Sequence, residues 1–164
     1  MMNRRSSKAQ AMVEFALALP IFLLVLYGLI EAGRLVFLYA TVGSSSREAV
    51  RYASAWGDNA AGDPQYLDCP GIRDTAKRVA FLLGLQNKDI AVAYYDGASG
   101  SAIGTCPNSG LASVTQTVKT GDRVAVTVSY SYSPIIAGFT ALSNKPIAST
   151  TARTIMGRLD LNKP

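Results

Sequence analysis

The feature that most constrains this chain is an uncharged run near its N-terminus, from Phe15 to Ile30. These sixteen residues would extend about 24 Å as an α-helix. With the flanking residues 9–14, the segment reaches the ~20 residues that cross the hydrocarbon core of a bilayer. Three basic residues precede it within the first eight positions. Because basic residues gather on the cytoplasmic side of a span, the sequence predicts a single-pass anchor with its N-terminus in the cytoplasm, or a secretion signal.

The run does not end as a cleaved signal peptide does. Such a peptide has an apolar region of about 7–15 residues followed by a cleavage site between small residues. Here Glu31 and Arg34 follow the run, and apolar residues then recur with close to the helical period as far as Trp56. We therefore expect one long helix over residues 10–56, with a membrane span at about residues 12–33.

Composition excludes several classes of function. The net charge is +5, but the basic leader supplies +3 of it, and the remaining thirteen basic residues are scattered among eleven acidic ones. We expect no nucleic-acid partner, since no basic stripe forms. The chain has no histidine, which excludes catalytic triads, histidine-ligated metals and imidazole acid–base chemistry. No nucleophile motif appears, so we expect no enzyme, no cofactor and no small-molecule substrate.

The two cysteines, Cys69 and Cys106, lie far apart in the sequence. Two cysteines alone do not make a structural zinc site. If the domain is exported, they are expected to form a disulfide that closes a ring of 38 residues, counting both ends. In the chain-entropy model such a link contributes roughly 3–4 kcal/mol.

Residues 57–164 are predicted to form an extracytoplasmic domain. A second amphipathic helix begins near Ile72 and ends at Gly84. Its polar side is expected to carry Arg73, Asp74, Lys77 and Arg78. Residues 96–121 are rich in Gly, Ser and Thr, which indicates a long loop or a loose hairpin around Ser113–Val118.

Three strands are predicted, at residues 90–95, 122–134 and 147–156, and the second of them shows clear alternation of its side chains. The fold class is therefore α+β: a long N-terminal transmembrane helix continues into a small domain, where the second helix packs on an antiparallel sheet of three to four strands. Residues 134–142 are apolar but too short to cross a membrane, and are expected to form a packed crossover or short helix, or to touch lipid or a neighbour.

Two further groups of residues allow more than one functional interpretation. Asp58, Asn59 and Asp63 invite a calcium site, but their spacing lacks the closing glutamate of a calcium loop; we expect no metal there and leave the question open. Four tyrosines would form either a carbohydrate-binding patch or part of the core, and alternation along strands favours the core. They are Tyr94, Tyr95, Tyr130 and Tyr132.

The segment KAQAMVEFALALPIFLLVLYGLIEAGRLVF resembles the N-terminus of TadE-like proteins, the pseudopilins of tight-adherence (Tad/Flp) pilus systems. Their pattern is a small residue, then Glu-Phe at the fifth and sixth positions after it, an early proline, and a Glu-x-Gly-Arg-like exit. The corresponding small residue here is Ala9, and Glu14 and Phe15 form the Glu-Phe pair. Pro20 is the early proline, and the exit segment contains Glu31, Gly33 and Arg34. Ala9 departs from the pattern, because the family usually has glycine there.

The resemblance implies processing. A prepilin peptidase would cut after Ala9, which removes the leader 1–9 and leaves Gln10 as the new N-terminus. In pilin-type assemblies the glutamate at the position of Glu14 pairs with the N-terminal amine of a neighbouring subunit, which offsets the desolvation of both charges. The alternative is that Glu14 lies at headgroup level and meets the helix dipole. Cyclisation of Gln10 would remove the amine and weaken the pairing.

Other residues of the helix suggest contacts with neighbours. Pro20 predicts a kink, which membranes tolerate. Gly28, Ala32 and Gly33 lie near small-xxx-small spacing, which permits close helix approach. Glu31 and Arg34, three residues apart, are placed to form an ion pair.

The resemblance thus implies a minor pilin or pseudopilin of a Tad-type pilus, structural or assembly-initiating. Its expected location is the bacterial inner membrane, with the domain outside and possible incorporation into a surface pilus. The expected partners are the inner membrane, a prepilin peptidase, other pilins and the Tad assembly machinery. The alternative is an uncleaved, membrane-anchored binding module that does not polymerise. The mature N-terminus distinguishes the two, because it is Gln10 in the first and at or near Met1 in the second.

Overall fold

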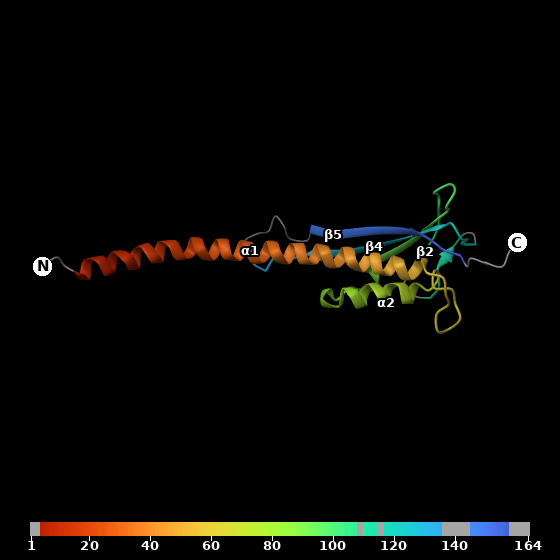
Figure 1. The fold of residues 1–164 in the computed structure, drawn as a ribbon, viewed down its shortest axis with the longest axis horizontal. Helices are drawn as coiled ribbons and strands as arrows, with labels where there is room; N and C mark the ends of the chain where they lie inside the picture. The colour runs from red at the N-terminus through yellow and green to blue at the C-terminus, as the bar shows by residue number, and fades with distance from the viewer. Residues whose placement is uncertain (1–3, 108–109, 115–116, 136–144, 158–164) are drawn as a thin grey trace.

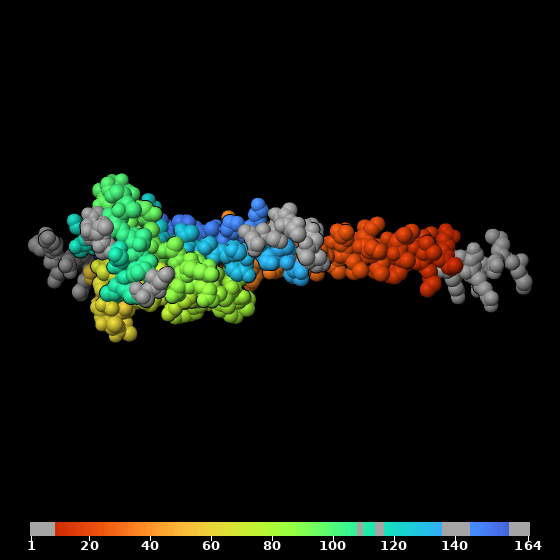
Figure 2. Space-filling model, turned by 180° about the vertical axis from the view of Figure 1, so that it is seen from behind, coloured from red at the N-terminus to blue at the C-terminus, as the bar shows by residue number. Residues whose placement is uncertain are grey.

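A single helix runs through more than half the length of the molecule (Figure 1). The computed structural model describes residues 4–107, 110–114, 117–135 and 145–157. Helix α1 spans Arg4–Ser54, 51 residues without a break. Its first half projects as a bare rod, and the rest of the chain packs along its second half (Figure 2). The predicted long helix, and the fold class built on it, are confirmed.

The second helix lies antiparallel to α1. Helix α2 spans Cys69–Val79 and is capped by Asp68, whose carboxylate accepts from the backbone N–H of Gly71 at 3.1 Å. Midway along the helix pair, the hydroxyl of Ser45 on α1 donates to the carbonyl of Ala76 on α2 at 2.9 Å. Two short 3₁₀ turns follow, η1 at Phe81–Leu83 and η2 at Asn87–Asp89.

Gly84 ends the second helical segment, as the sequence predicts. Its φ of 59° lies in the left-handed region, which a residue with a Cβ adopts at a cost. The helix is α-helical only to Val79, and the last residues before Gly84 form η1 instead.

The sheet has five antiparallel strands in the order β3-β2-β1-β4-β5. The strand bounds are β1 Ile90–Tyr95, β2 Ala102–Thr105, β3 Ser113–Val114, β4 Arg123–Tyr132 and β5 Lys145–Thr154. The three predicted strands correspond to β1, β4 and β5. The sheet is larger than the predicted three to four strands, because the expected long loop contributes β2 and β3. The apolar segment predicted at 134–142 falls almost wholly outside the described residues.

One face of the sheet packs on the two helices and holds the core. Val42, Val50 and Ala53 of α1 are fully buried, as are Val124, Val126 and Val128 of β4. Small polar residues join α1 to the edge strand: the Ser46 hydroxyl lies 3.0 Å from the hydroxyls of both Ser149 and Thr151 on β5. Small side chains at this contact let helix and sheet approach closely.

The tyrosines divide between the two faces of the sheet. Tyr94 and Tyr132 lie in the core with exposed fractions of 0% and 1%, and Tyr130 packs against it. Tyr95 is adjacent to Tyr94 in the same strand and therefore points to the opposite face. The preference for core over a surface patch is thus right for three of the four tyrosines.

The prediction for Arg73 is wrong. Instead of lying on the polar side of α2, its side chain is buried, with 3% exposed. Its guanidinium donates to three backbone carbonyls, those of Ile90 at 3.3 Å, Cys106 at 3.1 Å and Pro107 at 2.5 Å. A guanidinium carries five N–H donors in a rigid fork, so these acceptors compensate for its burial.

Candidate functional site: the apolar helix and its junction with the sheet

The first half of α1 presents apolar side chains on all sides. Large exposed apolar residues occur from Met12 to Tyr39, and the window that identifies a candidate membrane span is 0% buried within the protein. Among the described residues, this is the one helix long and apolar enough to cross a membrane. An uncovered surface of this kind is unstable in water and requires lipid or other helices around it.

The residues predicted for peptidase processing lie on consecutive turns of this bare helix. Ala9, Gln10 and Glu14 are all exposed, and Phe15 has an exposed fraction of 66%. The carboxylate of Glu14 accepts a hydrogen bond from the side-chain amide of Gln10 at 3.2 Å. The contact joins residues one turn apart, and over the described ranges no group of the domain pairs with Glu14. Its carboxylate remains available to a group from another molecule.

Three of the predicted assembly residues, Pro20, Gly28 and Gly33, lie in the middle of the helix. α1 continues through Pro20 without interruption. A Cβ added at Gly28 or at Gly33 would meet no atom within 4 Å. Since no contact within the described ranges requires glycine at these two positions, close approach of another helix is a physical reason for them.

Glu31 has a different environment, because it lies where the bare half of α1 meets the sheet. Its carboxylate is buried, with 8% of the residue exposed. The hydroxyl of Tyr132, the last residue of β4, donates to Glu31 Oε1, and the hydroxyl of Tyr27 donates to Oε2 at 3.4 Å. Arg34 Nη1 lies 3.2 Å from Oε1, so the predicted ion pair of Glu31 and Arg34 is present.

Arg34 extends the same cluster onto the chain after β4. Its Nη1 also donates to the carbonyl of Ser133 at 2.8 Å, and its guanidinium carbon lies 5.4 Å from the ring centroid of Tyr132. Burial, together with the bond to the Glu31 carboxylate, raises the pKa of the Tyr132 phenol. We call Tyr27, Glu31, Arg34 and Tyr132 the junction cluster.

Sequence reasoning found only half of the junction cluster. Glu31 and Arg34 were singled out from their spacing on one helix. Tyr132 lies 101 residues beyond Glu31, so its role depends on the sheet register. Its place at the end of a strongly alternating strand, on the core-facing side, was the one signal available.

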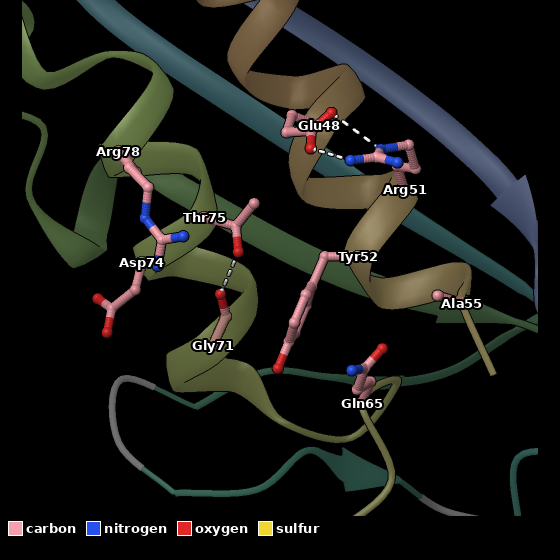
Figure 3. Close-up of a pocket in the computed structure, with 9 residues that line it drawn as sticks. All are labelled: Glu48, Arg51, Tyr52, Ala55, Gln65, Gly71, Asp74, Thr75 and Arg78. Carbon is pink, nitrogen blue, oxygen red and sulfur yellow. Dashed lines mark hydrogen bonds and ion pairs between the residues drawn. The ribbon is translucent and has the colours of Figure 1, made fainter. Parts of the chain in front are cut away.

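A polar groove lies between α1, α2 and the loop that joins them (Figure 3). Its volume is about 470 Å³. Arg51 forms an exposed ion pair with Glu48 at 2.5 Å, and this bond lowers the pKa of the Glu48 carboxyl. The Tyr52 hydroxyl donates to the carboxylate of Asp68 at 2.9 Å. Since both charge signs are represented and already partly paired, the groove itself indicates no ligand class.

Tyrosine burial predicts a loss of stability at alkaline pH. Burial, reinforced by the bond to Asp68, raises the pKa of Tyr52 to about 12, and burial raises the pKa of Tyr94 as well. Both phenols are therefore protonated in the folded chain at a pH where the unfolded chain, with pKa about 10, has ionised. This contribution is complete below about pH 10 and is lost as the pH rises above it.

The measurement is the free energy of unfolding as a function of pH in detergent micelles. Tyr94→Phe removes one such phenol and is expected to reduce the slope above about pH 10 by roughly 1 kcal/mol per pH unit. It also removes the hydrogen bond to the carbonyl of Tyr66, which lowers stability equally at all pH values. An unchanged slope in the variant would contradict the prediction.

The structure joins Cys69 to Cys106 by a disulfide, as the sequence predicts. Their Cα atoms lie 5.6 Å apart. The bond ties the N-terminus of α2 to the segment that follows β2, which Arg73 also holds through the carbonyls of Cys106 and Pro107. The disulfide and the hydrogen bonds of Arg73 thus hold the same segment, the residues that follow β2.

The Asp58–Asp63 loop is held by hydrogen bonds between its own residues. The side-chain oxygen of Asn59 accepts from the backbone N–H groups of Ala61 and Asp63, both at 2.9 Å. Over the described ranges, no three or more His, Cys, Asp or Glu side chains gather in a way that would hold a metal ion.

The comparisons with known proteins point to the long helix. Comparison with curated proteins and with solved structures gave no match. The model of the family described as TadE-like protein matches residues 9–51. That range begins at the predicted processing position, includes Glu14 and the junction residues Glu31 and Arg34, and ends within α1. The resemblance inferred from the sequence is therefore confirmed over residues 9–51, where the chain is similar to the TadE-like family.

Proposed function

We propose that this protein is a pilin-like subunit of a Tad-type pilus system, a minor pilin or pseudopilin with a structural or assembly-initiating role. The observation that carries the proposal is the coincidence of two features. The TadE-like match covers residues 9–51, and the first half of the same helix lies bare of its own domain. Such a rod is suited first to a bilayer and then to packing against other apolar helices.

In this proposal the N-terminus faces the cytoplasm of a bacterial inner membrane and the disulfide-bonded domain lies outside. Basic residues at positions 4, 5 and 8 favour that orientation, and a disulfide persists in an oxidising compartment. A prepilin peptidase cuts between Ala9 and Gln10. The protein acts through association of α1 with other pilins and with the Tad assembly machinery, and no catalytic step is assigned to it.

Glu14 is the residue that selects the partner. An exposed carboxylate on an apolar helix is costly to bury unless a cation meets it. The new N-terminal amine of a neighbouring subunit supplies that cation at the same depth. The amide of Gln10, which bonds Glu14 here, belongs to the residue that cleavage would make N-terminal.

The test is mass spectrometry of the mature N-terminus in cells with and without the prepilin peptidase. We expect Gln10, free or cyclised, when the peptidase is present, and an N-terminus at or near Met1 when it is absent. An intact leader in both strains would contradict processing and would favour the uncleaved binding module.

A second experiment compares two variants, Glu14→Ala and Glu14→Gln. Both variants remove the charge, but only Glu14→Gln keeps a polar side chain of the same size. We expect both to insert in the membrane at normal levels and both to be lost from sheared pilus fractions. Normal incorporation of either variant would remove the pairing role from Glu14.

A further inference from the structure

The turn after α2 exposes two large apolar side chains next to each other. Phe81 and Leu82 lie in η1 with exposed fractions of 73% and 66%. Leu83 packs against the core, and Leu85 is buried with 6% exposed. Leu83, partly buried, and Leu85, buried, anchor the turn, so the outward position of its first two residues is fixed by the fold. Isolated exposed leucines are common, whereas an adjacent Phe–Leu pair on an anchored turn requires a reason.

The turn lies at the end of α2 that points toward the bare half of α1, while the end of β4 reaches farther along α1, to Glu31 and Arg34 (Figures 1 and 2). The bond between Ser45 and Ala76 places these two residues at one level of the antiparallel helices. Phe81 is five residues beyond Ala76, so it lies about level with Ala40 of α1.

That level coincides with the end of the exposed apolar surface of α1. Large exposed apolar side chains on α1 run from Met12 to Tyr39. These 28 residues extend about 42 Å, close to the ~40–45 Å thickness of a bilayer with its headgroup layers. If α1 spans the membrane as proposed above, Phe81 and Leu82 lie at the outer edge of the headgroup layer.

The charges around the turn are mainly basic. Lys77, Arg78 and Lys88 surround it on α2 and η2. Lys77 donates to the side-chain oxygen of Asn87 at 2.5 Å and also lies 3.7 Å from Asp74, one turn farther from the bilayer. The carboxylate of Asp89 accepts from the backbone of Gln86. A phenylalanine and a leucine framed by basic residues match the chemistry of an anionic bilayer surface.

We propose that Phe81 and Leu82 insert into the headgroup region of the same bilayer that α1 spans. The turn is then a second attachment point, displaced sideways from the first by the spacing of two packed helices. Two such points fix both the tilt of α1 and the face that the domain turns to the membrane. This proposal rests on the membrane anchoring of the proposed function.

The experiment uses the full-length chain in vesicles of phosphatidylcholine and phosphatidylglycerol, with and without lipids brominated near the headgroup. The chain has one tryptophan, Trp56, which is 60% exposed and lies beyond the far end of α1. It is about 20 Å farther from the bilayer than the turn, so the wild-type protein is the matched control. The test variant combines Trp56→Phe with Phe81→Trp, which places the reporter on the turn at an exposed position that tolerates a larger ring.

We expect brominated lipid to quench the reporter at residue 81 at least threefold more than it quenches Trp56. Equal quenching at the two positions would overturn the proposal. A reporter at residue 81 that is shielded from aqueous iodide but unquenched by brominated lipid would also overturn it, because protein rather than lipid would then cover the turn.

Flotation of the same vesicles is measured in parallel. A chain that floats with the vesicles while residue 81 stays unquenched would overturn only the second contact. A chain that does not float would overturn the membrane anchoring itself, and with it the proposed function.

Discussion

Replacing both cysteines, Cys69→Ala with Cys106→Ala, is expected to lower the free energy of unfolding of the domain by about 3–4 kcal/mol. The disulfide joins residues separated by 37 positions, so its removal restores much conformational freedom to the unfolded chain. Alanine suits the site at Cys69, which is fully buried in apolar surroundings. The measurement is denaturant unfolding in mild detergent, followed by near-ultraviolet circular dichroism of the buried tyrosines.

Wild-type protein treated with a reductant is the control, because it loses the same link without a change of sequence. We expect its unfolding midpoint to fall by nearly as much as that of the double variant. Arg73 still holds the carbonyls of Cys106 and Pro107 in both samples, so the native fold is retained and the comparison stays valid. A midpoint that does not move on reduction would show that the bond adds nothing to the stability of this domain.

Glu31→Ala is expected to release the end of β4 from α1, at a cost of about 3 kcal/mol. The substitution removes the acceptor of the Tyr132 hydroxyl and leaves Arg34 without its carboxylate. Because the lost contacts lie at one end of the sheet, the effect should be local. Hydrogen exchange of the amides of Val128–Tyr132 should become about 100-fold faster, since each 1.4 kcal/mol corresponds to about tenfold. The amides of β1 should change little.

The matched control is Glu48→Ala on the same helix. Glu48 also pairs with an arginine three residues later, Arg51, but this pair is exposed. Exposed pairs contribute little to stability, so exchange in the sheet should hardly respond. If Glu31→Ala affects β4 no more than Glu48→Ala does, the junction cluster does not hold the sheet to the helix.

Local patterns were sufficient to predict the elements that have a strong period of their own. The apolar run with its helical continuation predicted α1, and alternation in residues 122–134 predicted β4. The segments β2 and β3 have four and two residues, too few for a period to be visible. They are strands because β2 pairs with the free edge of β1 and β3 then pairs with β2.

Residues whose environment comes from distant parts of the chain were the ones misjudged or missed. Arg73 follows a helical pattern that places it among charged residues, but its acceptors at Cys106 and Pro107 lie 33 and 34 residues away. Tyr132 was assigned to the core from alternation, yet its partner Glu31 was not foreseen. The role of Glu14 in assembly stays a prediction, because its expected partner belongs to another molecule.

The continuity of α1 also has a mechanical consequence. From the middle of the proposed span, near Leu23, to Ser54 the helix extends about 46 Å. The domain is fastened along this shaft, so a lean of roughly 10° within the bilayer would sweep its outermost end through about 8 Å. A displacement that is small in the lipid is thus magnified at the far tip, and the shaft acts as a lever arm.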